Sequence, residues 1–363
     1  MPRFLKWGLV ALASLLALLF IARILFAVQI GEAVFKRAIA QQLGVDPLAD
    51  LPDGLHVVLI GTGSPLPDPN RAGPSTAIIA GEDIYIIDSG GGAVRNMGEM
   101  RISPARVSAV FLTHLHSDHI DGLGELALQR WAGGGHRTPL RVHGPDGTQQ
   151  LVDSLKQAYP PDSLFRIAHH GQNVVPQSGF GMVASTIAIN AGGDENHAAL
   201  QTDKGLIVRA FRVDHDPVSP AFGYRFEYKG RSVTISGDTA FDPRVAAAAK
   251  DTDLLLHEAL NADMVNVMKD AATEAGNRRL AKIFHDIQDY HATPVQAAQT
   301  AANANAGALV YTHIVPALPS KLLYPYWLKG AGDFYDGPIT IGEDGMLFSL
   351  PADGSKMTRR RLK

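Results

Sequence analysis

Six consecutive residues constrain this chain more than any other feature: His114-Leu115-His116-Ser117-Asp118-His119. The apolar run directly before them, residues 109–113, predicts a β-strand, and a glycine-containing helix start follows. In a loop that leaves a strand, alternate side chains can converge on one metal ion while the adjacent Asp118 and His119 turn toward a second. The segment therefore predicts a metal site. The alternative is that its histidines are solvated loop residues.

Composition limits the ligands that such a site can use. The chain has no cysteine, so disulfides and thiolate ligands are excluded and histidine and carboxylate remain. Basic and acidic residues nearly balance, at 33 against 36, and the formal net charge is −3. No global field would therefore draw the protein to nucleic acid or anionic lipid, and binding to a polyanion would need a local patch.

The first 30 residues differ from the rest in hydropathy. Residues 7–22 are apolar and uncharged, follow Arg3 and Lys6, and apolar character resumes through Ile30, which is enough for the roughly 20 residues that span a bilayer. Residues 1–30 are thus predicted to be a signal anchor or a signal peptide. An uncleaved anchor is favoured because residues 26–29 fit a cleavage site poorly. We expect a membrane-anchored or exported protein whose main domain lies outside the cytoplasm, in the periplasm of a Gram-negative cell.

Residues 51–350 are predicted to form one mixed α/β domain, after a linker at 31–50 and before a basic tail at 351–363. Short β-branched apolar runs, expected to be strands, occupy residues 56–60, 84–87, 107–112, 206–213, 233–235, 254–256 and 308–311. Helices are predicted between them, at 122–131, 148–158 and 294–305. Thr293 can cap the last helix, Pro294 suits its first turn, and Gly307 is expected to end it in a left-handed conformation.

Three further candidate ligands, His215, Asp238 and His313, each follow a predicted strand. With the histidine-rich segment, their order resembles the metallo-β-lactamase superfamily over residues 54–345. The resemblance implies an αββα sandwich and two divalent ions, Zn²⁺ with Mn²⁺ or Fe as alternatives. One ion would be held by His114, His116 and His215, the other by Asp118, His119 and His313, and Asp238 would bridge them. Two such ions can share a hydroxide and clamp the attacking and leaving oxygens of a displacement.

Finer motifs resemble the branch that contains ribonuclease Z and the metal-dependent arylsulfatases. They are the opening loop at 61–65, the segments 87–90 and 236–239, and the segments 257–259 and 290–293. The bridging Asp238 argues against a true β-lactamase, and His116 stands where flavodiiron oxidoreductases have glutamate. The opening loop lacks the third glycine and helix start of a dinucleotide-binding motif.

The same resemblance implies catalytic roles for three residues. His291 would be the general acid for the leaving oxyanion, because a histidine near its normal pKa can supply a proton. Glu258 would hold that imidazole by hydrogen bonding and favour its charged form. Asp118 would also orient the attacking water. The alternatives are a packing role for His291 and a structural role for Glu258.

The sequence indicates the substrate less directly than it indicates the metal site. Ribonuclease Z enzymes hold precursor tRNA with a basic arm, whereas the corresponding residues 160–204 contain only Arg166 and Lys204 as permanent cations, against Asp162, Asp194, Glu195 and Asp203. Because polyanion affinity comes largely from phosphate neutralisation, this composition argues against an RNA clamp.

Three functional hypotheses follow. The first is a hydrolase of small-molecule esters (sulfate ester, phosphodiester, phosphotriester or lactone) that acts through a bridging hydroxide, with no nucleic-acid partner and with membrane contact through the N-terminal segment. The alternative is a ribonuclease Z-type endonuclease that processes tRNA 3′ ends. The third is a non-catalytic metal-binding protein. A homodimer is expected by resemblance only.

Overall fold

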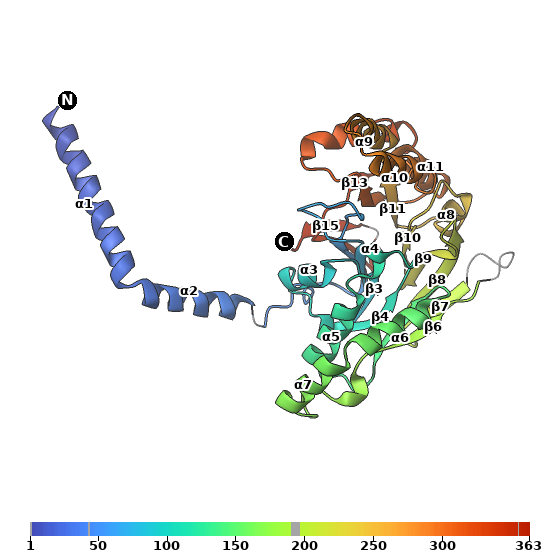
Figure 1. Cartoon of the computed structure of the whole chain (residues 1–363), viewed down its shortest axis with the longest axis horizontal. Helices are drawn as coiled ribbons and strands as arrows, with labels where there is room; N and C mark the ends of the chain where they lie inside the picture. Colours follow the sequence, from blue (N-terminus) through green and yellow to red (C-terminus); the bar gives the residue numbers. More distant parts are fainter. Residues whose placement is uncertain (1, 43, 190–196, 355) are drawn as a thin grey trace. The chain divides into compact units, whose positions relative to one another are not determined.

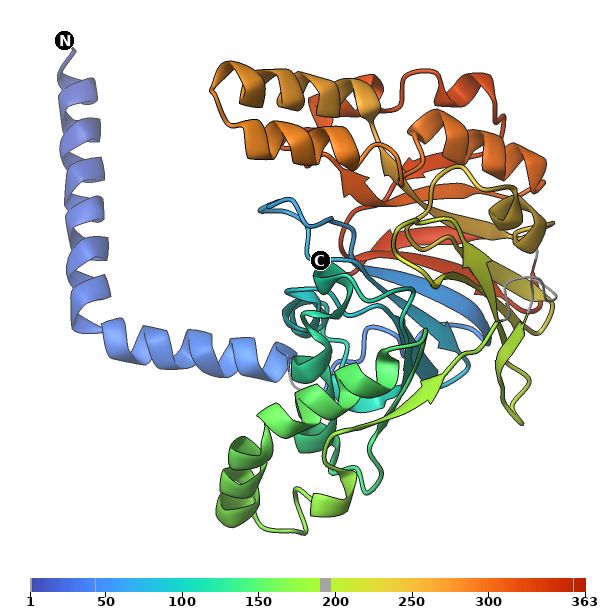
Figure 2. The same ribbon diagram turned by 45° about the vertical axis from the view of Figure 1, so that its right-hand side comes forward.

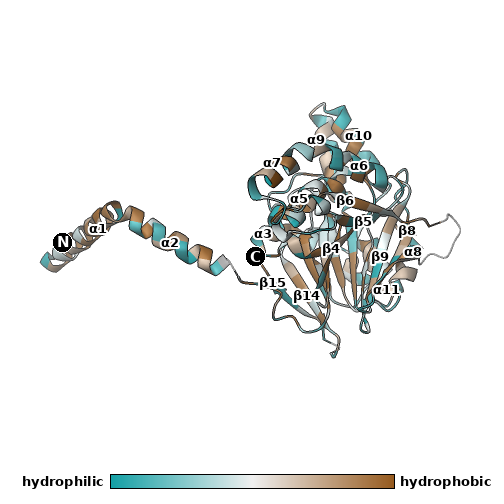
Figure 3. Cartoon of the chain, turned by 90° about the horizontal axis from the view of Figure 1, so that it is seen from below, coloured by the Kyte–Doolittle hydropathy of each residue, from teal (hydrophilic) through white to brown (hydrophobic). Residues whose placement is uncertain are grey.

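The computed structural model describes residues 2–42, 44–189, 197–354 and 356–363, and it divides the chain into two compact units, Met1–Ala49 and Asp50–Lys363 (Figure 1). The first unit consists of helices α1 (Arg3–Leu25) and α2 (Ala27–Gln42). Helix α1 has a mean hydropathy of 2.5 over its most apolar window and is long enough to cross a membrane, although a signal sequence would meet the same criterion. Helix α2 alternates hydrophobic and hydrophilic residues (Figure 3) and occupies much of the predicted linker.

The second unit is built on two β-sheets. The first sheet has eight strands in the order β15-β14-β1-β2-β3-β4-β5-β6, and the second has seven in the order β13-β12-β11-β10-β9-β8-β7. The strands of the first sheet are β1 (Gly54–Gly61), β2 (Ser75–Ala80), β3 (Asp83–Ile87), β4 (Val107–Phe111), β5 (Leu140–Gly144), β6 (Met182–Thr186), β14 (Met346–Pro351) and β15 (Thr358–Arg361). Those of the second are β7 (His197–Gln201), β8 (Ile207–Val213), β9 (Ala221–Tyr228), β10 (Arg231–Ile235), β11 (Leu254–Leu260), β12 (Leu309–Val315) and β13 (Ile339–Ile341).

Helices accompany the two sheets, and several of them cover the outer sheet faces (Figure 2). They are α3 (Ala93–Glu99), α4 (Ser117–Ile120), α5 (Leu123–Gly134), α6 (Thr148–Ala158), α7 (Pro160–His170), α8 (Pro243–Ala248), α9 (Ala262–Glu274), α10 (Arg278–Asp286), α11 (Pro294–Asn303) and α12 (Tyr324–Trp327). Helices α3, α5 and α6 contact the first sheet, whereas α8 and α11 contact the second. This is the mixed α/β metallo-β-lactamase architecture with two sheets that the sequence predicted.

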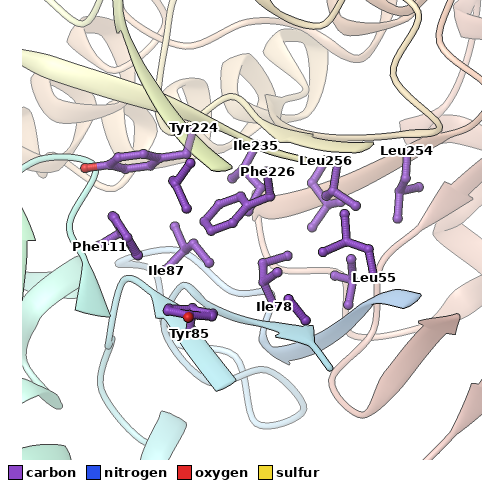
Figure 4. Close-up of a cluster of buried hydrophobic side chains, with 14 of the residues drawn as sticks. Leu55, Ile78, Tyr85, Ile87, Phe111, Tyr224, Phe226, Ile235, Leu254 and Leu256 are labelled. Carbon is purple, nitrogen blue, oxygen red and sulfur yellow. The ribbon is translucent and has the colours of Figure 1, made fainter. Parts of the chain in front are cut away.

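The main core lies between the two sheets (Figure 4). Leu55 and Phe111 reach it from the first sheet and Phe226 and Leu256 from the second, all fully buried. Phe111 packs edge-on against Phe226, with ring centroids 5.7 Å apart. Because alternate strand residues share a face, the central strands place the residues of one face in this core, and the resulting rigidity holds the loops at the strand ends in place.

Two predicted boundaries differ in detail from the structure. Helix α11 has the predicted Thr293 cap, completed by Gln296 as a capping box, but Asn305 rather than Gly307 adopts the left-handed conformation after it (φ 50°). A Cβ on Gly307 would lie 2.7 Å from the Asp253 carbonyl oxygen, so close packing accounts for that glycine. The segment predicted as a basic tail adds strand β15, which pairs antiparallel with β14.

Residues 160–204 form α7, β6 and β7. Their two permanent cations are already paired, since Arg166 contacts Asp162 at 2.7 Å and Lys204 contacts Asp83 at 2.8 Å. Asp194 and Glu195 lie outside the described residues. The described part of this region therefore offers no unpaired permanent cation for RNA.

Candidate metal centre

All seven predicted metal ligands come together at one edge of the two sheets. The carboxyl end of β4 leads into the histidine-rich segment, and the ends of β8 and β10 lead to His215 and Asp238. His313 lies within the last residues of β12. Strands β8, β10 and β12 run in the same direction in the second sheet, so their carboxyl ends share an edge. Loops at such an edge are the usual place for a site in an α/β protein.

The first group of side chains contains three imidazoles. His114 Nε2 lies 2.9 Å from His116 Nδ1, and His215 Nε2 lies 3.4 Å from the same His116 nitrogen. The candidate ligand atoms of all three lie within 4.8 Å of one another, so one ion could contact all of them. The Nδ1 atom of His215 faces the Tyr290 carbonyl oxygen at 3.0 Å, which leaves Nε2 free to act as the ligand.

The second group combines a carboxylate with two imidazoles. Asp118 Oδ2 lies 3.3 Å from His313 Nε2 and 3.5 Å from His119 Nε2. His313 has a φ of 46°, in the left-handed region that residues other than glycine rarely adopt. Positions of this kind cluster at functional sites, because the surrounding structure must hold them there.

Asp238 lies between the two groups. Its Oδ2 atom is 3.2 Å from both His119 Nε2 and His313 Nε2, and 3.9 Å from His114 Nε2. The side chain is almost fully buried. A carboxylate in this position can contact an ion in either group, as the predicted bridging role requires.

Burial and the local charges place His114, His215 and Asp238 in the ionisation states that bind cations. At His119 burial would lower the pKa, but Asp238 and Asp88 outweigh it and raise that pKa well above the usual range. Burial lowers the pKa of His114 well below its usual range and that of His215 to about 4, so both rings are neutral at neutral pH. Burial alone would raise the pKa of Asp238, but His313 and His119 outweigh it and hold that pKa well below the usual range. Neutral imidazoles and an ionised carboxylate are the ligand forms of these side chains.

Asp88 is a part of the site that the sequence analysis did not identify. Its Oδ2 atom lies 2.8 Å from His119 Nδ1, and the carboxylate also accepts hydrogen bonds from the Thr113 backbone N–H and hydroxyl, each at 2.8 Å. This contact turns His119 Nε2 toward Asp238. The sequence feature that could have identified Asp88 is its position directly after β3. Strand β3 runs parallel to β4, so both strands end at the same edge of the sheet.

Replacing Asp88 with asparagine is expected to weaken metal binding about 10- to 100-fold, because an uncharged amide makes the His119 imidazole a weaker ligand. Titration of the metal-free protein with Zn²⁺ against a competing chelator would measure the change. Asp83→Asn is the matched control, since Asp83 lies at the opposite end of β3 and pairs with Lys204. Equal affinities for the two variants would show that Asp88 does not support the site.

Glu258 and His291 form a buried pair beside these ligands. His291 Nδ1 lies 3.2 Å from Glu258 Oε1, which also accepts hydrogen bonds from the backbone N–H groups of Ala292 (2.9 Å) and Thr239 (3.3 Å). His291 is within reach of Asp238 and His313, so it faces the same centre.

The ionisation of this pair differs from the sequence prediction. Burial lowers the pKa of His291 and raises that of Glu258 well above its usual range. Burial thus opposes the charged imidazole that the sequence prediction expected Glu258 to favour. The physical reason is that both side chains are almost fully buried, and desolvation outweighs their mutual attraction. Burial therefore favours the uncharged form of both side chains.

The donor set fits divalent cations. It consists of imidazole nitrogens and carboxylate oxygens, which suit zinc, manganese and iron alike. The buried Nε2 atom of His119 has no hydrogen-bond partner among the described residues, although the Asp118 and Asp238 carboxylates lie beside it. A bound cation would satisfy this atom and offset the repulsion between the carboxylates.

Comparisons with known proteins agree with this geometry. The family described as "Beta-lactamase superfamily domain" matches residues 85–314. The chain is 35% identical over 292 residues to a protein named Ribonuclease Z from Mycobacterium marinum, covering 80% of this chain and 96% of the relative. It is 36% identical to the Ribonuclease Z of Mycobacterium avium with the same coverage.

Solved structures share the fold. Human tRNase Z, short form, matches with a TM-score of 0.57 and 24% identity, over 82% of this chain and 99% of that one. The metallo-β-lactamase fold protein YhfI from Bacillus subtilis matches with a TM-score of 0.57 and 19% identity, over 81% and 98%.

These relatives correct two expectations from the sequence. The small-molecule ester substrate is wrong, and so is the exclusion of nucleic acid as a partner, because relatives matched over nearly their whole length are named as ribonucleases. The exclusion relied on the charge of residues 160–204, and the composition of one segment does not report on cations elsewhere in the fold. The chain is a hydrolase that belongs to the metallo-β-lactamase superfamily and, within it, to the ribonuclease Z-like branch.

Proposed function

We propose that this protein is a divalent metal-dependent endonuclease of the ribonuclease Z type, which hydrolyses a phosphodiester bond at the 3′ side of precursor tRNA. The observation that supports this most strongly is the 35% identity to a ribonuclease Z over 96% of that relative's length. The convergence of seven imidazole and carboxylate side chains on one buried centre is consistent with it.

We propose that two divalent ions are held by the two groups described above, with Asp238 between them. When bound, the ions would supply a nucleophilic oxygen at neutral pH and neutralise the charge of the phosphate. Asp118 would orient the attacking water, since its carboxylate is the least buried of the site's acidic groups.

The Glu258–His291 pair would supply the proton that the leaving oxygen needs. The carboxyl proton of Glu258 would face His291 Nδ1, which lies 3.2 Å from Oε1, while the neutral imidazole would carry its own proton on Nε2. Transfer of a proton from the imidazole to the leaving oxygen, with the carboxyl replacing it, would leave a neutral ring and a carboxylate. Backbone N–H groups of Ala292 and Thr239 are positioned to stabilise that carboxylate.

Cleavage of a precursor tRNA with a 3′ trailer tests this proposal. The full chain in detergent, loaded with Zn²⁺ or Mn²⁺, is expected to release the trailer in one cut, and a chelator is expected to stop the reaction. Gel analysis of end-labelled RNA would identify the cleavage site. A metal-loaded, folded protein that leaves the RNA intact would reject the function.

We further propose that α1 anchors the protein in a membrane and that the catalytic domain faces the cytoplasm. The apolar length of α1 supports an anchor. Three basic residues, Arg23, Lys36 and Arg37, follow the apolar segment, against Arg3 and Lys6 before it, which favours a cytoplasmic carboxyl-terminal side. An RNA substrate requires the same side. Protease accessibility of the domain in intact and opened spheroplasts would distinguish the two orientations.

A further inference from the structure

A groove of about 810 Å³ adjoins the loops of the metal centre. Arg71 and Ala72 line it, and the next residues of that loop, Pro74 and Ser75, line the small pocket that contains His119 and Asp238. The Gly90–Gly91 turn packs against the Asp118 backbone on one side and borders the groove on the other. The groove is thus continuous with the backbone that positions the metal ligands.

Four solvent-accessible cations line this groove: Arg95, Lys321, Arg361 and Lys363. Arg95 on α3 is exposed and has no ion-pair partner among the described residues. Lys321 and Arg361 both contact Glu343, each at 2.6 Å, so a single negative charge is shared by two positive charges. Their side chains remain 69% and 49% exposed, which leaves them accessible to a ligand.

Strand β15 brings the carboxyl-terminal cations to this groove. Lys363 contacts Glu99 on α3 at 3.2 Å, and Figure 1 shows the carboxyl terminus next to α3. Arg359 lies on the same face of β15 as Arg361, because alternate strand residues share a face. The positive charge of the groove therefore comes from segments that are far apart in the sequence.

The acidic residues of the groove offset this charge only in part. Asp344 is 2% exposed and accepts hydrogen bonds from Thr62, Ala72 and Asn96. Burial raises its pKa, and these donors occupy both carboxylate oxygens, so Asp344 presents little accessible negative charge to the groove. Glu99 is the exposed acidic residue, at 63%. The accessible surface of the groove is therefore predominantly basic.

We propose that this groove binds backbone phosphates of the RNA substrate, in place of a basic arm in residues 160–204. The proposal rests on the proposed ribonuclease function. An RNA strand whose scissile phosphate lies at the metal centre would lead its neighbouring phosphates into the adjoining groove. Arg95, Lys321 and Arg361 provide exposed guanidinium and ammonium groups there, and such contacts dominate the affinity of proteins for nucleic acids.

The double variant Arg95→Ala/Lys321→Ala tests the groove. The full chain in detergent would be titrated into fluorescently labelled mature tRNA, and anisotropy recorded at several salt concentrations between about 50 and 200 mM. Each lost phosphate contact is expected to lower the slope of log K against log salt by about 1 and to weaken binding roughly tenfold near 0.1 M salt. The double variant should therefore bind at least tenfold more weakly, with a smaller salt dependence.

The matched control is Arg141→Ala/Lys250→Ala. Both residues are exposed cations, and neither lines the groove. They lie near the starts of β5 and β11, away from the carboxyl ends where the metal ligands gather. This variant should keep the wild-type affinity and salt slope. The melting temperature and zinc content of both variants would confirm that they are folded.

The possible outcomes distinguish failure of the groove proposal from failure of the proposed ribonuclease function. If wild-type protein cleaves precursor tRNA and the folded groove variant binds tRNA with unchanged affinity and slope, the groove proposal is overturned and the function stands. If wild-type protein neither cleaves nor binds tRNA, both are overturned. A similar loss of binding in the control variant would show diffuse electrostatic attraction and would also overturn the groove.

Discussion

Replacing Asp238 with asparagine is expected to reduce RNA cleavage about 1,000-fold or more and to lower the metal content from two ions per chain to about one. The carboxylate Oδ2 lies 3.2 Å from His119 Nε2 in the second group and 3.9 Å from His114 Nε2 in the first, so its charge is available to both candidate ion positions. Loss of one ion removes charge stabilisation worth several kcal/mol in the transition state, and about 4 kcal/mol corresponds to this change in rate. Elemental analysis and single-turnover cleavage would measure the two effects.

Asp242→Asn is the matched control for Asp238. Asp242 is also buried, and its carboxylate accepts hydrogen bonds from the Arg244 backbone, which caps α8, and from the Asp214 backbone; asparagine can retain one of the two with its single carbonyl oxygen. This variant should keep both ions and most of the activity. Retention of two ions and normal cleavage by Asp238→Asn would contradict the bridging role.

His291→Ala is expected to slow cleavage of precursor tRNA by about 100- to 10,000-fold, the range usual for a lost general acid. The ribose oxygen of RNA is a poor leaving group and needs a proton, whereas a nitrophenolate departs without one. Hydrolysis of a bis-nitrophenyl phosphodiester, used only as a probe, should therefore slow much less. Comparing kcat for the two substrates would measure the difference.

Two further variants support this comparison. Glu258→Gln should show the same leaving-group dependence to a smaller degree, because an amide can hold the His291 ring but cannot pass on a proton. His285→Ala, an exposed histidine on α10, should have no effect on either substrate. Equal slowing of both substrates by His291→Ala would exclude it as the proton donor.

The charge of one segment is not enough to exclude RNA binding, because cations from distant segments can gather on one surface. Residues 160–204, which correspond to the basic arm, contain few cations, and the structure pairs both of the permanent ones. Positive charge instead gathers around Arg95, Lys321 and Arg361, which are separated by more than 200 residues from first to last. Tertiary contacts bring these residues to one surface, because Lys363, just after β15, pairs with Glu99 on α3, and Lys321 and Arg361 share Glu343.

The sequence by itself determined the two-sheet fold and the set of candidate ligands. Strand periodicity is local, and a polar residue directly after a strand identifies the sheet edge, so His114, His215 and Asp238 could be named without coordinates. Only the tertiary structure determined which side chains orient these ligands and which ionisation states the neighbouring side chains adopt. The contact of Asp88 with His119 and the neutral state of the Glu258–His291 pair depend on distance and burial between distant segments. Periodicity and spacing carry no information on either quantity, because both arise when the two sheets and their loops pack together.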